Sequence, residues 1–456
     1  MDFEQIVSAQ RNYFLTDATK DVAFRKAALQ KLYDAVIRKE AAIFEALRKD
    51  LNKCDFEAYM SEVGIVREEC RHAIAHLGSW ARKKRVSSPL SQFPCRSFIL
   101  NEPYGVALIM SPWNYPFQLT LCPLIGAIAA GNCAVIKPSA YSPATSQIIA
   151  DLIADIFPPE YITVVQGGRT ENAALLEQTF DYIFFTGSTT VGRLVMEKAS
   201  ANLTPVTLEL GGKSPAIIDS TVDLKLTARR ICWGKFLNAG QTCVAPDYVL
   251  VEESVRDAFL TACAETIKES FPNGSLTDPD YVHIINEKQF TRVSPYLSDG
   301  TPVTGGGSDP ATRAIEPTIL RDITFDSPVM QEEIFGPILP VITYTDIDAV
   351  IRELKQRPKP LALYIFSKNG AFQGKLLNSV SFGGGCINDT VIHLVNGKLG
   401  FGGVGASGMG AYHGKRSFDT FTHEKSIIDK KTWLDLPMRY RPYKKLNFKL
   451  LRFFLR

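Results

Sequence analysis

The sequence contains no Cys-x-x-Cys pair, and its positive and negative charges nearly balance. Its nine cysteines are an odd number without regular spacing, which argues against a disulfide framework or a zinc cluster and indicates a reducing compartment. The net charge is only +3 over 456 residues, so the overall electrostatics give no support for nucleic-acid binding. We therefore expect a cytoplasmic protein with no nucleic-acid partner.

The sequence also lacks an evident membrane segment. The start, MDFEQIVSAQRN, has acidic residues and no apolar core, which is unlike a secretory signal. Residues 106–136 carry no charged side chain, but a transmembrane helix needs about 20 consecutive apolar residues. Prolines, glycines and amide side chains interrupt this run, so we expect a buried strand, a loop, a helix and a second strand.

What is present is an α/β pattern in two parts. Residues 1–85 place apolar side chains at three- and four-residue spacing, which is typical of amphipathic helices. From residue 104, short apolar runs such as YIFFTG alternate with helical stretches, and a second alternation extends from about 216 to 385. Such alternation predicts parallel sheets with crossover helices. We expect two lobes with the active site between them.

Cys243 is the candidate nucleophile, in the segment NAGQTCVAP. Small residues and a glycine let backbone amides approach an exposed side chain closely. A thiol has an ordinary pKa near ~8.5 and must be activated by its surroundings to attack at neutral pH. The alternative is a buried and inert cysteine, which is the interpretation that we give to the other eight.

Glu209 and Asn114 are candidate partners of that thiol. Glu209 lies in the apolar run VTLEL, where burial would raise its pKa toward the range of a general base; the alternative is a partly exposed carboxylate at a strand end. Asn114 lies in SPWNYPF, where prolines stiffen the loop. Its amide can donate to a developing oxyanion, and the alternative is an ordinary turn asparagine.

Two glycine-rich segments differ in their context. Gly187 to Gly192 follows the apolar run YIFFT and precedes a helical pattern, so this turn can present N–H groups to a phosphate. Gly403 to Gly408 matches G-x-G-x-x-G, but no strand precedes it and no clear helix follows, so we interpret the match as accidental. The segment EECRHAIAH lacks a glutamate beside its first histidine, and we expect no metal site.

The chain resembles the aldehyde dehydrogenase superfamily in seven segments that occur in order between residues 112 and 423: PWNYPF, AVIKPS, FTGSTTVG, LELGGKSP, GQTC, QEEIFGPILP and FGGVGASGMGAYHGKRSFDTFTH. The short N-terminus and GMGAYHGK look most like the dimeric class-3 branch. The resemblance implies a Rossmann-type NAD(P)-binding domain at 1–85 and 102–208 and an α/β catalytic domain at 209–400. It also implies a small oligomerisation arm at 86–101 and 411–437, and a homodimer.

The resemblance also implies roles for single residues. Cys243 matches the nucleophile, Glu209 the general base that activates water, and Asn114 the oxyanion hole. The cofactor-binding positions are matched by Lys137, Gly187, Ser188, Gly192, Glu333 and Phe335. Phe401 matches a residue of the substrate pocket, and the aromatic side chains of Trp113, Tyr115 and Trp233 also fit an apolar pocket. The implied reaction is the oxidation of an aldehyde, medium- or long-chain aliphatic or aromatic, to a carboxylic acid.

One departure from the family pattern concerns the cofactor. Many members that prefer NAD, class-3 relatives included, have an acid just after the Lys-Pro of this strand, whereas here the segment reads Lys137-Pro138-Ser139-Ala140. A carboxylate there binds the ribose 2′-OH and repels a 2′-phosphate. We therefore expect the enzyme to use NAD or NADP.

The C-terminal residues 438–456 form a basic amphipathic tail with seven Lys or Arg residues and no acid. The tail is too short and too charged to span a bilayer. Two interpretations remain: it packs on the enzyme near the substrate entrance, which we favour, or it lies on an anionic membrane surface.

Two other functions compete with aldehyde oxidation. A non-redox cysteine esterase or hydrolase would use the same thiol and oxyanion hole, but it would not need Lys137, Glu333 or the Gly187 turn. A binding or structural protein on the same scaffold would need none of Cys243, Glu209 and Asn114, so their joint presence counts against it.

Overall fold

The computed structural model describes residues 2–435 and 439–454. The first lobe is built on a six-stranded sheet in the order β17-β7-β6-β3-β4-β5, in which β3 to β7 are parallel. Every residue of β3, β4 and β6 is buried, as expected for a parallel sheet that is covered on both faces. The strands are β3 Val106–Met110, β4 Cys133–Lys137, β5 Ile162–Val164, β6 Tyr182–Thr186, β7 Val206–Glu209 and β17 Gly408–Met409.

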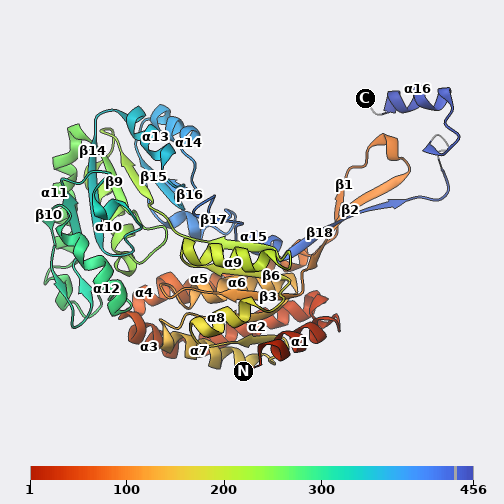
Figure 1. The fold of residues 1–456 in the computed structure, drawn as a ribbon, viewed down its shortest axis with the longest axis horizontal. Coiled ribbons are helices and arrows are strands. Elements are labelled where there is room, and N and C mark those ends of the chain that lie inside the picture. The colour runs from red at the N-terminus through yellow and green to blue at the C-terminus, as the bar shows by residue number, and fades with distance from the viewer. Residues whose placement is uncertain (1, 436–438, 455–456) are drawn as a thin grey trace.

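Helices cover both faces of this sheet (Figure 1). The predicted strand, loop, helix and strand of residues 106–136 are confirmed, and the buried helix between the strands is α6 (Gln118–Ala130). The expected N-terminal helices are also confirmed; they are α1 Phe3–Phe14, α2 Val22–Arg38, α3 Glu40–Leu51, α4 Asp55–Ala58 and α5 Gly64–Trp80. The remaining helices of the lobe are α7 Pro143–Ile156, α8 Arg169–Leu176, α9 Thr189–Ser200 and α15 Lys415–Thr420.

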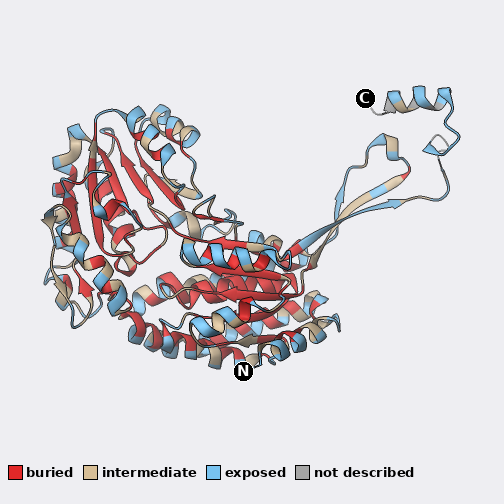
Figure 2. Cartoon of the chain, in the orientation of Figure 1, coloured by how far each residue is buried: buried red, intermediate tan, exposed pale blue. Residues whose placement is uncertain are grey.

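The second lobe contains a seven-stranded sheet in the order β10-β13-β14-β9-β8-β15-β16, parallel except for the edge strand β10. Its strands are β8 Pro215–Ile218, β9 Tyr248–Glu252, β10 Thr301–Thr304, β13 Thr318–Arg321, β14 Ile338–Tyr344, β15 Ala362–Phe366 and β16 Gly384–Ile387, and a small ribbon pairs β11 Ser308–Asp309 with β12 Ala314–Ile315. The helices are α10 Leu224–Phe236, α11 Arg256–Ser270, α12 Glu287–Val293, α13 Ile347–Gln356 and α14 Gly370–Ser379. The inner strands of both sheets are buried (Figure 2), whereas the edge strands β10 and β16 are partly exposed.

A three-stranded antiparallel arm projects from the first lobe (Figure 1). It consists of β1 Lys84–Val86, β2 Cys95–Pro103 and β18 Thr422–Lys430. The arm was expected to resume at residue 411, but residues 408–420 belong to the first lobe. β17 joins the sheet beside β7, and α15 packs on α6, because Phe418 and Phe421 are apolar side chains that bury there.

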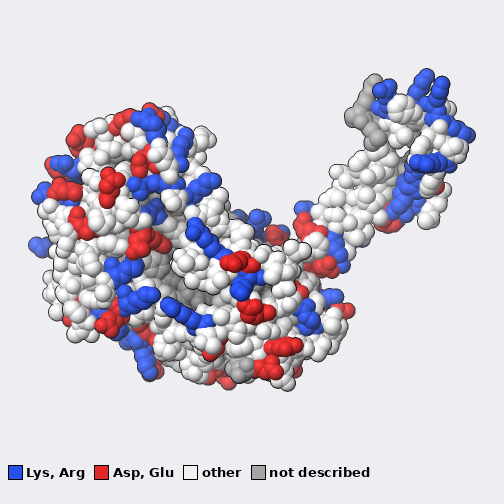
Figure 3. Space-filling view, viewed as in Figure 1, with Lys and Arg blue, Asp and Glu red and all other residues white. Residues whose placement is uncertain are grey.

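The C-terminal helix α16 (Lys445–Phe454) lies beyond the end of the arm, away from both lobes (Figures 1 and 3). Its Leu451 shares a groove with Ser91, Gln92 and Ile428 of the arm. The favoured prediction was that the tail packs on the enzyme near the substrate entrance. The place is wrong for this chain, because the tail lies beside the arm, away from both lobes. Residues 438, 455 and 456 of the predicted tail, and 436–437 of the predicted arm, lie outside the described residues. Among the described residues, no helix is both long enough and apolar enough to cross a membrane.

Candidate active site

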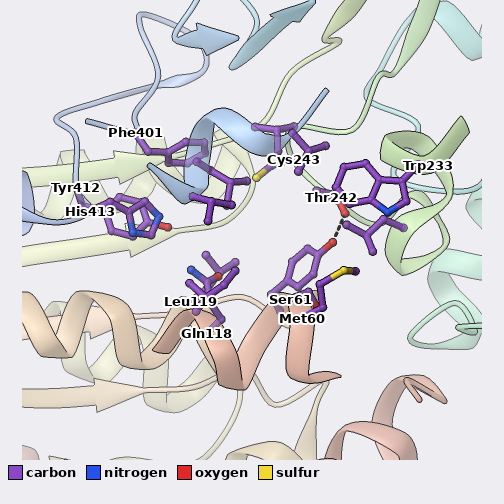
Figure 4. A pocket seen from close by; sticks show the side chains of 17 residues that line it. Met60, Ser61, Gln118, Leu119, Trp233, Thr242, Cys243, Phe401, Tyr412 and His413 are labelled. Atoms are coloured by element: carbon purple, nitrogen blue, oxygen red, sulfur yellow. Dashed lines mark hydrogen bonds between the residues drawn. The ribbon is translucent and has the colours of Figure 1, made fainter. Parts of the chain in front are cut away.

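Cys243 lies where two cavities meet, between the lobes. Its side chain lines an apolar cavity, shown in Figure 4, and also a cleft that contains Glu209 and Glu333. The preceding turn is strained: Asn238 and Ala239 have φ values of 54° and 50°, in the left-handed region that non-glycine residues rarely adopt. This conformation carries the chain past the lobe interface and leaves the thiol half-buried at the junction.

Hydrogen bonds from buried amide side chains fix this turn. The Nδ2 of Asn114 donates to the carbonyl of Gln241 at 2.9 Å, and the Nδ2 of Asn238 donates to the carbonyl of Asn114 at 2.8 Å. The Nε2 of Gln241 donates to the carbonyl of His283 at 3.1 Å. Asn114 is thus brought beside the Cys243 turn, as predicted, with one of its two N–H bonds engaged in holding that turn.

The loop that carries Asn114 is anchored by a buried ion pair. Glu62 accepts hydrogen bonds from the backbone N–H groups of Phe117 and Gln118, and it pairs with Lys53 at 2.6 Å, with both side chains fully buried. Burial of such a pair requires that its remaining polar atoms be satisfied. Glu62 meets this condition by capping the N-terminal end of α6, where backbone N–H groups lack helical partners. No sequence motif pointed to Lys53 or Glu62.

Glu209 ends β7 and is 2% exposed. Among the described residues, neither of its carboxyl oxygens has a hydrogen-bond partner, and burial raises its pKa well above the usual range of a carboxyl. The predicted burial is therefore confirmed. A dry, unpartnered carboxyl that faces the same cleft as Cys243 is suited to exchange protons with water or substrate there.

The segment Gly403–Gly408 is not a dinucleotide turn, as expected. It leads into β17, and Gly408 pairs antiparallel with Glu209. The N–H of Leu210 donates to the carbonyl of Ser407 at 3.1 Å. These glycines allow a second chain segment to approach the strand that carries Glu209 closely.

Burial and two nearby carboxyls act on the Cys243 thiol. Burial is the main reason that its pKa is raised, and the nearby carboxyls of Glu333 and Glu209 act in the same direction. Both effects oppose ionisation of the thiol.

Most of the predicted cofactor residues line a continuous cleft. One part contains Lys137, Ala140, Gly187 and Ser188, and the other contains Gly187, Ser188, Glu209, Cys243, Glu333 and Phe335. The side chain of Ser188 caps the N-terminus of α9 by accepting from Val191 N. Gly192, also predicted to bind the cofactor, is buried in the first turns of α9 and is not among the cleft-lining residues; a Cβ there would lie 2.7 Å from the side-chain end of Leu210. A turn and a helix N-terminus at this place can receive a phosphate.

Lys137 and Glu333 lie at opposite parts of the cleft, and burial displaces the pKa of both. The ammonium of Lys137 donates to the carbonyls of Pro138 and Gly167 at 2.7 and 2.6 Å, while burial lowers its pKa to about 8. Burial raises the pKa of Glu333 to about 8, with the Asp247 charge adding to the effect. The buried ammonium of Lys137 at one part and the half-buried carboxyl of Glu333 at the other match the polar groups that two riboses present.

The apolar cavity brings together the predicted pocket residues Tyr115, Trp233 and Phe401 (Figure 4). The hydroxyl of Tyr115 lies 2.6 Å from that of Thr242, beside Cys243. Trp113 was also predicted in this pocket, but it lines the cofactor cleft, with its ring 5.3 Å from that of Phe335.

Several residues of the site were missed from the sequence. Those of the pocket include Met60, Ser61, Ile65, Leu119, Val391, Val395, Tyr412 and His413, and those of the cleft include Lys288, Gln289 and Arg292. Most come from helices or loops whose apolar pattern looked like ordinary core, and no local signal separates a cavity wall from a core face.

Comparisons with known proteins agree with this geometry. The Aldehyde dehydrogenase family model matches residues 1–427. The 4,4'-diaponeurosporen-aldehyde dehydrogenase of Staphylococcus aureus is 51% identical over 455 residues, which cover 99% of both chains. Aldehyde dehydrogenase family 3 member B1 of the mouse is 44% identical over 451 residues, covering 98% of this chain and 96% of the mouse protein.

A solved structure of Staphylococcus aureus AldH in a substrate-bound state superposes with a TM-score of 0.98 at 50% identity, and the match covers all of both chains. The named relatives are aldehyde dehydrogenases, and nothing in these comparisons supports the hydrolase alternative. The chain therefore belongs to the aldehyde dehydrogenase family, in its class-3 branch, and is an NAD(P)-dependent enzyme that oxidises aldehydes to carboxylic acids.

Proposed function

We propose that Cys243 is the nucleophile, Glu209 the general base and Asn114 an oxyanion-hole donor of this oxidation. The observation that carries the proposal is the position of Cys243, which faces the apolar pocket on one side and the cleft containing Glu209 on the other. An aldehyde seated in the pocket presents its carbonyl carbon to the sulfur. The nicotinamide cofactor, when bound, supplies the hydride acceptor.

The chain's own groups account for the remaining steps. The thiolate of Cys243 attacks the carbonyl carbon, and the second N–H of the Asn114 amide, with the backbone N–H of Cys243, stabilises the oxyanion. Loss of hydride leaves a thioester on Cys243. Glu209 takes a proton from water, which attacks the thioester and releases the acid. The dry surroundings of Glu209 limit hydrolysis to water that enters by the cleft.

The decisive test is the reduction of NAD and NADP by the wild-type enzyme and by Cys243→Ala over a series of aldehydes, followed by absorbance. We expect the variant to lose the reaction. Undiminished reduction by Cys243→Ala would overturn the proposed mechanism.

The cleft fits NAD and NADP by its chemistry. We infer that Lys137 and Glu333 contact the two riboses, that the Gly187–Gly192 turn receives the pyrophosphate, and that Phe335 packs beside the nicotinamide. Ala140 lines the adenosine part of the cleft, where a carboxylate would discriminate against a 2′-phosphate. We therefore propose that both cofactors are used.

The substrate that best fits the pocket is a medium- or long-chain aliphatic or aromatic aldehyde. The lining is formed mainly by aromatic and aliphatic side chains, and Trp233 and Val395 are 41% and 61% exposed at its outer part. An apolar tail gains free energy from each methylene that leaves water, at about 0.8 kcal/mol. The Staphylococcus aureus relative is named for its action on 4,4'-diaponeurosporen-aldehyde, and this name is consistent with a bulky apolar substrate.

We propose a homodimer in the cytoplasm. The arm presents Val86, Leu90, Phe93, Ile427 and Ile428 as exposed apolar side chains, and α9 presents Val191, Leu194 and Met196. Side chains of this kind are commonly buried against a second copy. Sedimentation of the intact chain should give twice the monomer mass, and a monomer at micromolar concentration would contradict the proposal.

The tail is proposed to contact anionic membrane surfaces peripherally. The tail alternates basic residues with the exposed aromatic residues Tyr440 and Tyr443; the basic residues are Arg439, Arg441, Lys444 and Lys445. Figure 3 shows that positive charge gathers at this end of the molecule. Basic and aromatic side chains together favour an anionic lipid interface. Deletion of residues 440–456 should abolish cosedimentation with phosphatidylserine vesicles, and unchanged cosedimentation would reject the contact.

A further inference from the structure

Two charged residues that no proposed catalytic step uses hold the loop at the nicotinamide part of the cleft. This loop, residues 328–337, carries both Glu333 and Phe335. The carboxylate of Asp247 accepts from the backbone N–H of Ile334, between them, at 3.0 Å through one oxygen and from the ammonium of Lys213 at 2.6 Å through the other. Asp247 is 3% exposed, so these bonds are shielded from water.

Lys213 contacts the same loop directly. Besides its bond to Asp247, its ammonium donates to the carbonyls of Val329 and Glu332, each at 2.9 Å. All three donors of the ammonium are therefore used, and two of the three bonds end on the loop that bears Glu333. Lys213 and Asp247 together fix the loop at three backbone positions.

Lys213 and Asp247 lie close in sequence to the proposed base and the proposed nucleophile. Lys213 follows Glu209 by four residues, and Asp247 follows Cys243 by four residues. The N–H of Asp247 also donates to the carbonyl of Ser214 at 2.8 Å, which ties these two segments to each other. The segments that carry the base and the nucleophile thus each send one charged side chain to the loop that carries Glu333 and Phe335.

The loop needs such support because its backbone is not in a relaxed conformation. Phe335 has a φ of 52°, which is costly for an aromatic residue and persists only where surrounding contacts impose it. A Cβ on Gly211 would collide with the Glu333 carboxylate, so Glu333 lies directly against the chain between Glu209 and Lys213. A small shift of the loop would therefore move Glu333 and Phe335 relative to Cys243.

We propose that the Lys213–Asp247 pair is a positioning element that sets the nicotinamide end of the cofactor against Cys243. The inference rests on the proposed roles of Glu333 and Phe335. Arg292 supports the loop from its other side through the carbonyl of Ile334 at 2.8 Å and the carboxylate of Glu332 at 3.0 Å. The arginine side chain is more exposed than those of Lys213 and Asp247, so its contribution is smaller.

The test compares Asp247→Asn and Lys213→Met with the double variant Lys213→Met/Asp247→Leu. Either single change leaves one buried charge without its partner and destabilises the fold, whereas the double change removes both charges and should restore much of the stability. Asp219→Asn is the matched control, because Asp219 is a buried carboxylate of the same lobe that bonds Ser367 and Thr221 instead of the loop.

Three readouts separate positioning from a merely structural effect. Hydrogen exchange at Ile334 in the cofactor-free enzyme should accelerate in all pair variants. The Kd of NADH can be measured by the quenching of tryptophan fluorescence, because Trp113 lies in the cleft. This Kd should rise about tenfold or more, which corresponds to about 1.4 kcal/mol. The KM for NAD should rise similarly while the KM for the aldehyde stays within about twofold, and Asp219→Asn should match the wild type.

Hydrolysis of p-nitrophenyl acetate without cofactor distinguishes this inference from the proposed function. We expect this reaction to depend on Cys243 and not on the loop, so the stable double variant should retain it while losing NADH affinity. If the double variant binds NADH as the wild type does, the positioning role is refuted even though the Cys243 mechanism stands. If Cys243→Ala leaves aldehyde oxidation intact, the underlying mechanism fails instead.

Discussion

The two cavities that meet at Cys243 are built in different ways. The aldehyde pocket is lined by side chains from scattered parts of the chain, such as Met60, Trp233 and Val395. The cofactor cleft is lined largely by turns at the strand ends, such as Lys137–Tyr141 after β4 and Thr186–Ser188 after β6. The cleft therefore presents backbone groups and a few charged residues in fixed places, whereas the pocket presents shape and apolar surface. The cofactor cleft therefore contributes mainly to the reaction, and the aldehyde pocket mainly to the selection of the substrate.

The largest effect is expected from Glu209→Gln, which leaves both cavities intact and removes only the base. The loss of general-base catalysis should lower kcat by about 10³-fold, within the usual range of such a group. Stopped-flow measurement should still show a rapid burst of NADH, because hydride transfer precedes the step that needs Glu209. Loss of the burst together with turnover would place Glu209 earlier in the reaction.

Asn114→Ala tests the part of the junction that both cavities share. The loss of an oxyanion donor should lower kcat by about 10²–10³-fold, with dehydrogenation and cofactor-free ester hydrolysis affected alike. Asn101→Ala, an asparagine of the arm that donates to the carbonyl of Trp80, is the control. A defect confined to dehydrogenation would mean that Asn114 serves the cleft alone.

Ala140→Glu changes the cleft and leaves the pocket untouched. A carboxylate in the adenosine part should repel the 2′-phosphate and raise the KM for NADP by at least about tenfold, with the KM for NAD unchanged or lower. In the wild type, the ratio of kcat/KM for NAD to that for NADP should stay below about 10³. A larger ratio would rule out dual cofactor use.

Trp233→Ala changes the pocket and leaves the cleft untouched. The loss of apolar contact should raise the KM for a long-chain aldehyde about tenfold, have little effect on a two- or three-carbon aldehyde, and leave the KM for NAD unchanged. Trp433→Ala on the arm, where the side chain is 70% exposed, is the matched control. Equal effects on short and long aldehydes would argue against a role in selecting chain length.

The smallest effect is a gain in stability. Burial raises the pKa of Glu209, so the folded protein binds this proton more tightly than the unfolded chain does. Between the unfolded pKa, near ~4.3, and the higher folded pKa, the carboxyl is ionised in the unfolded chain but protonated in the folded protein. The free energy of unfolding therefore falls as the pH rises through this range. Glu209→Gln should raise the free energy of unfolding by about 1–3 kcal/mol at neutral pH and by less at pH 4, as calorimetry at both pH values would show. An equal gain in the free energy of unfolding at both pH values would show that the titration of Glu209 does not contribute to stability.

Much of the fold and the chemistry of the cleft could be predicted from the sequence. The alternation of buried strands and helices predicted both sheets, and the glycine-rich turn after YIFFT predicted the position of Gly187, because such a turn needs small residues at neighbouring positions. Glu209 was a candidate from its place at a strand end, and Glu333 was named only through the family resemblance. The pocket wall was largely missed, since Met60, Val395 and His413 come together only through tertiary packing. The electrostatic surroundings of the Cys243 thiol could not be predicted either, because they depend on burial and on two carboxyls that are distant in sequence.

The central claim is that Cys243, at the junction of the two cavities, bears the acyl group as a thioester. Trapping that acyl group tests the claim most directly. Glu209→Gln should be incubated with a long-chain aldehyde and NAD, quenched in acid and analysed by peptide mass spectrometry. We expect one acyl adduct, on the peptide that contains Cys243, which requires both aldehyde and NAD to form and which Cys243→Ala/Glu209→Gln lacks. An adduct on another residue, or NADH formation in a burst without any adduct, would contradict the account.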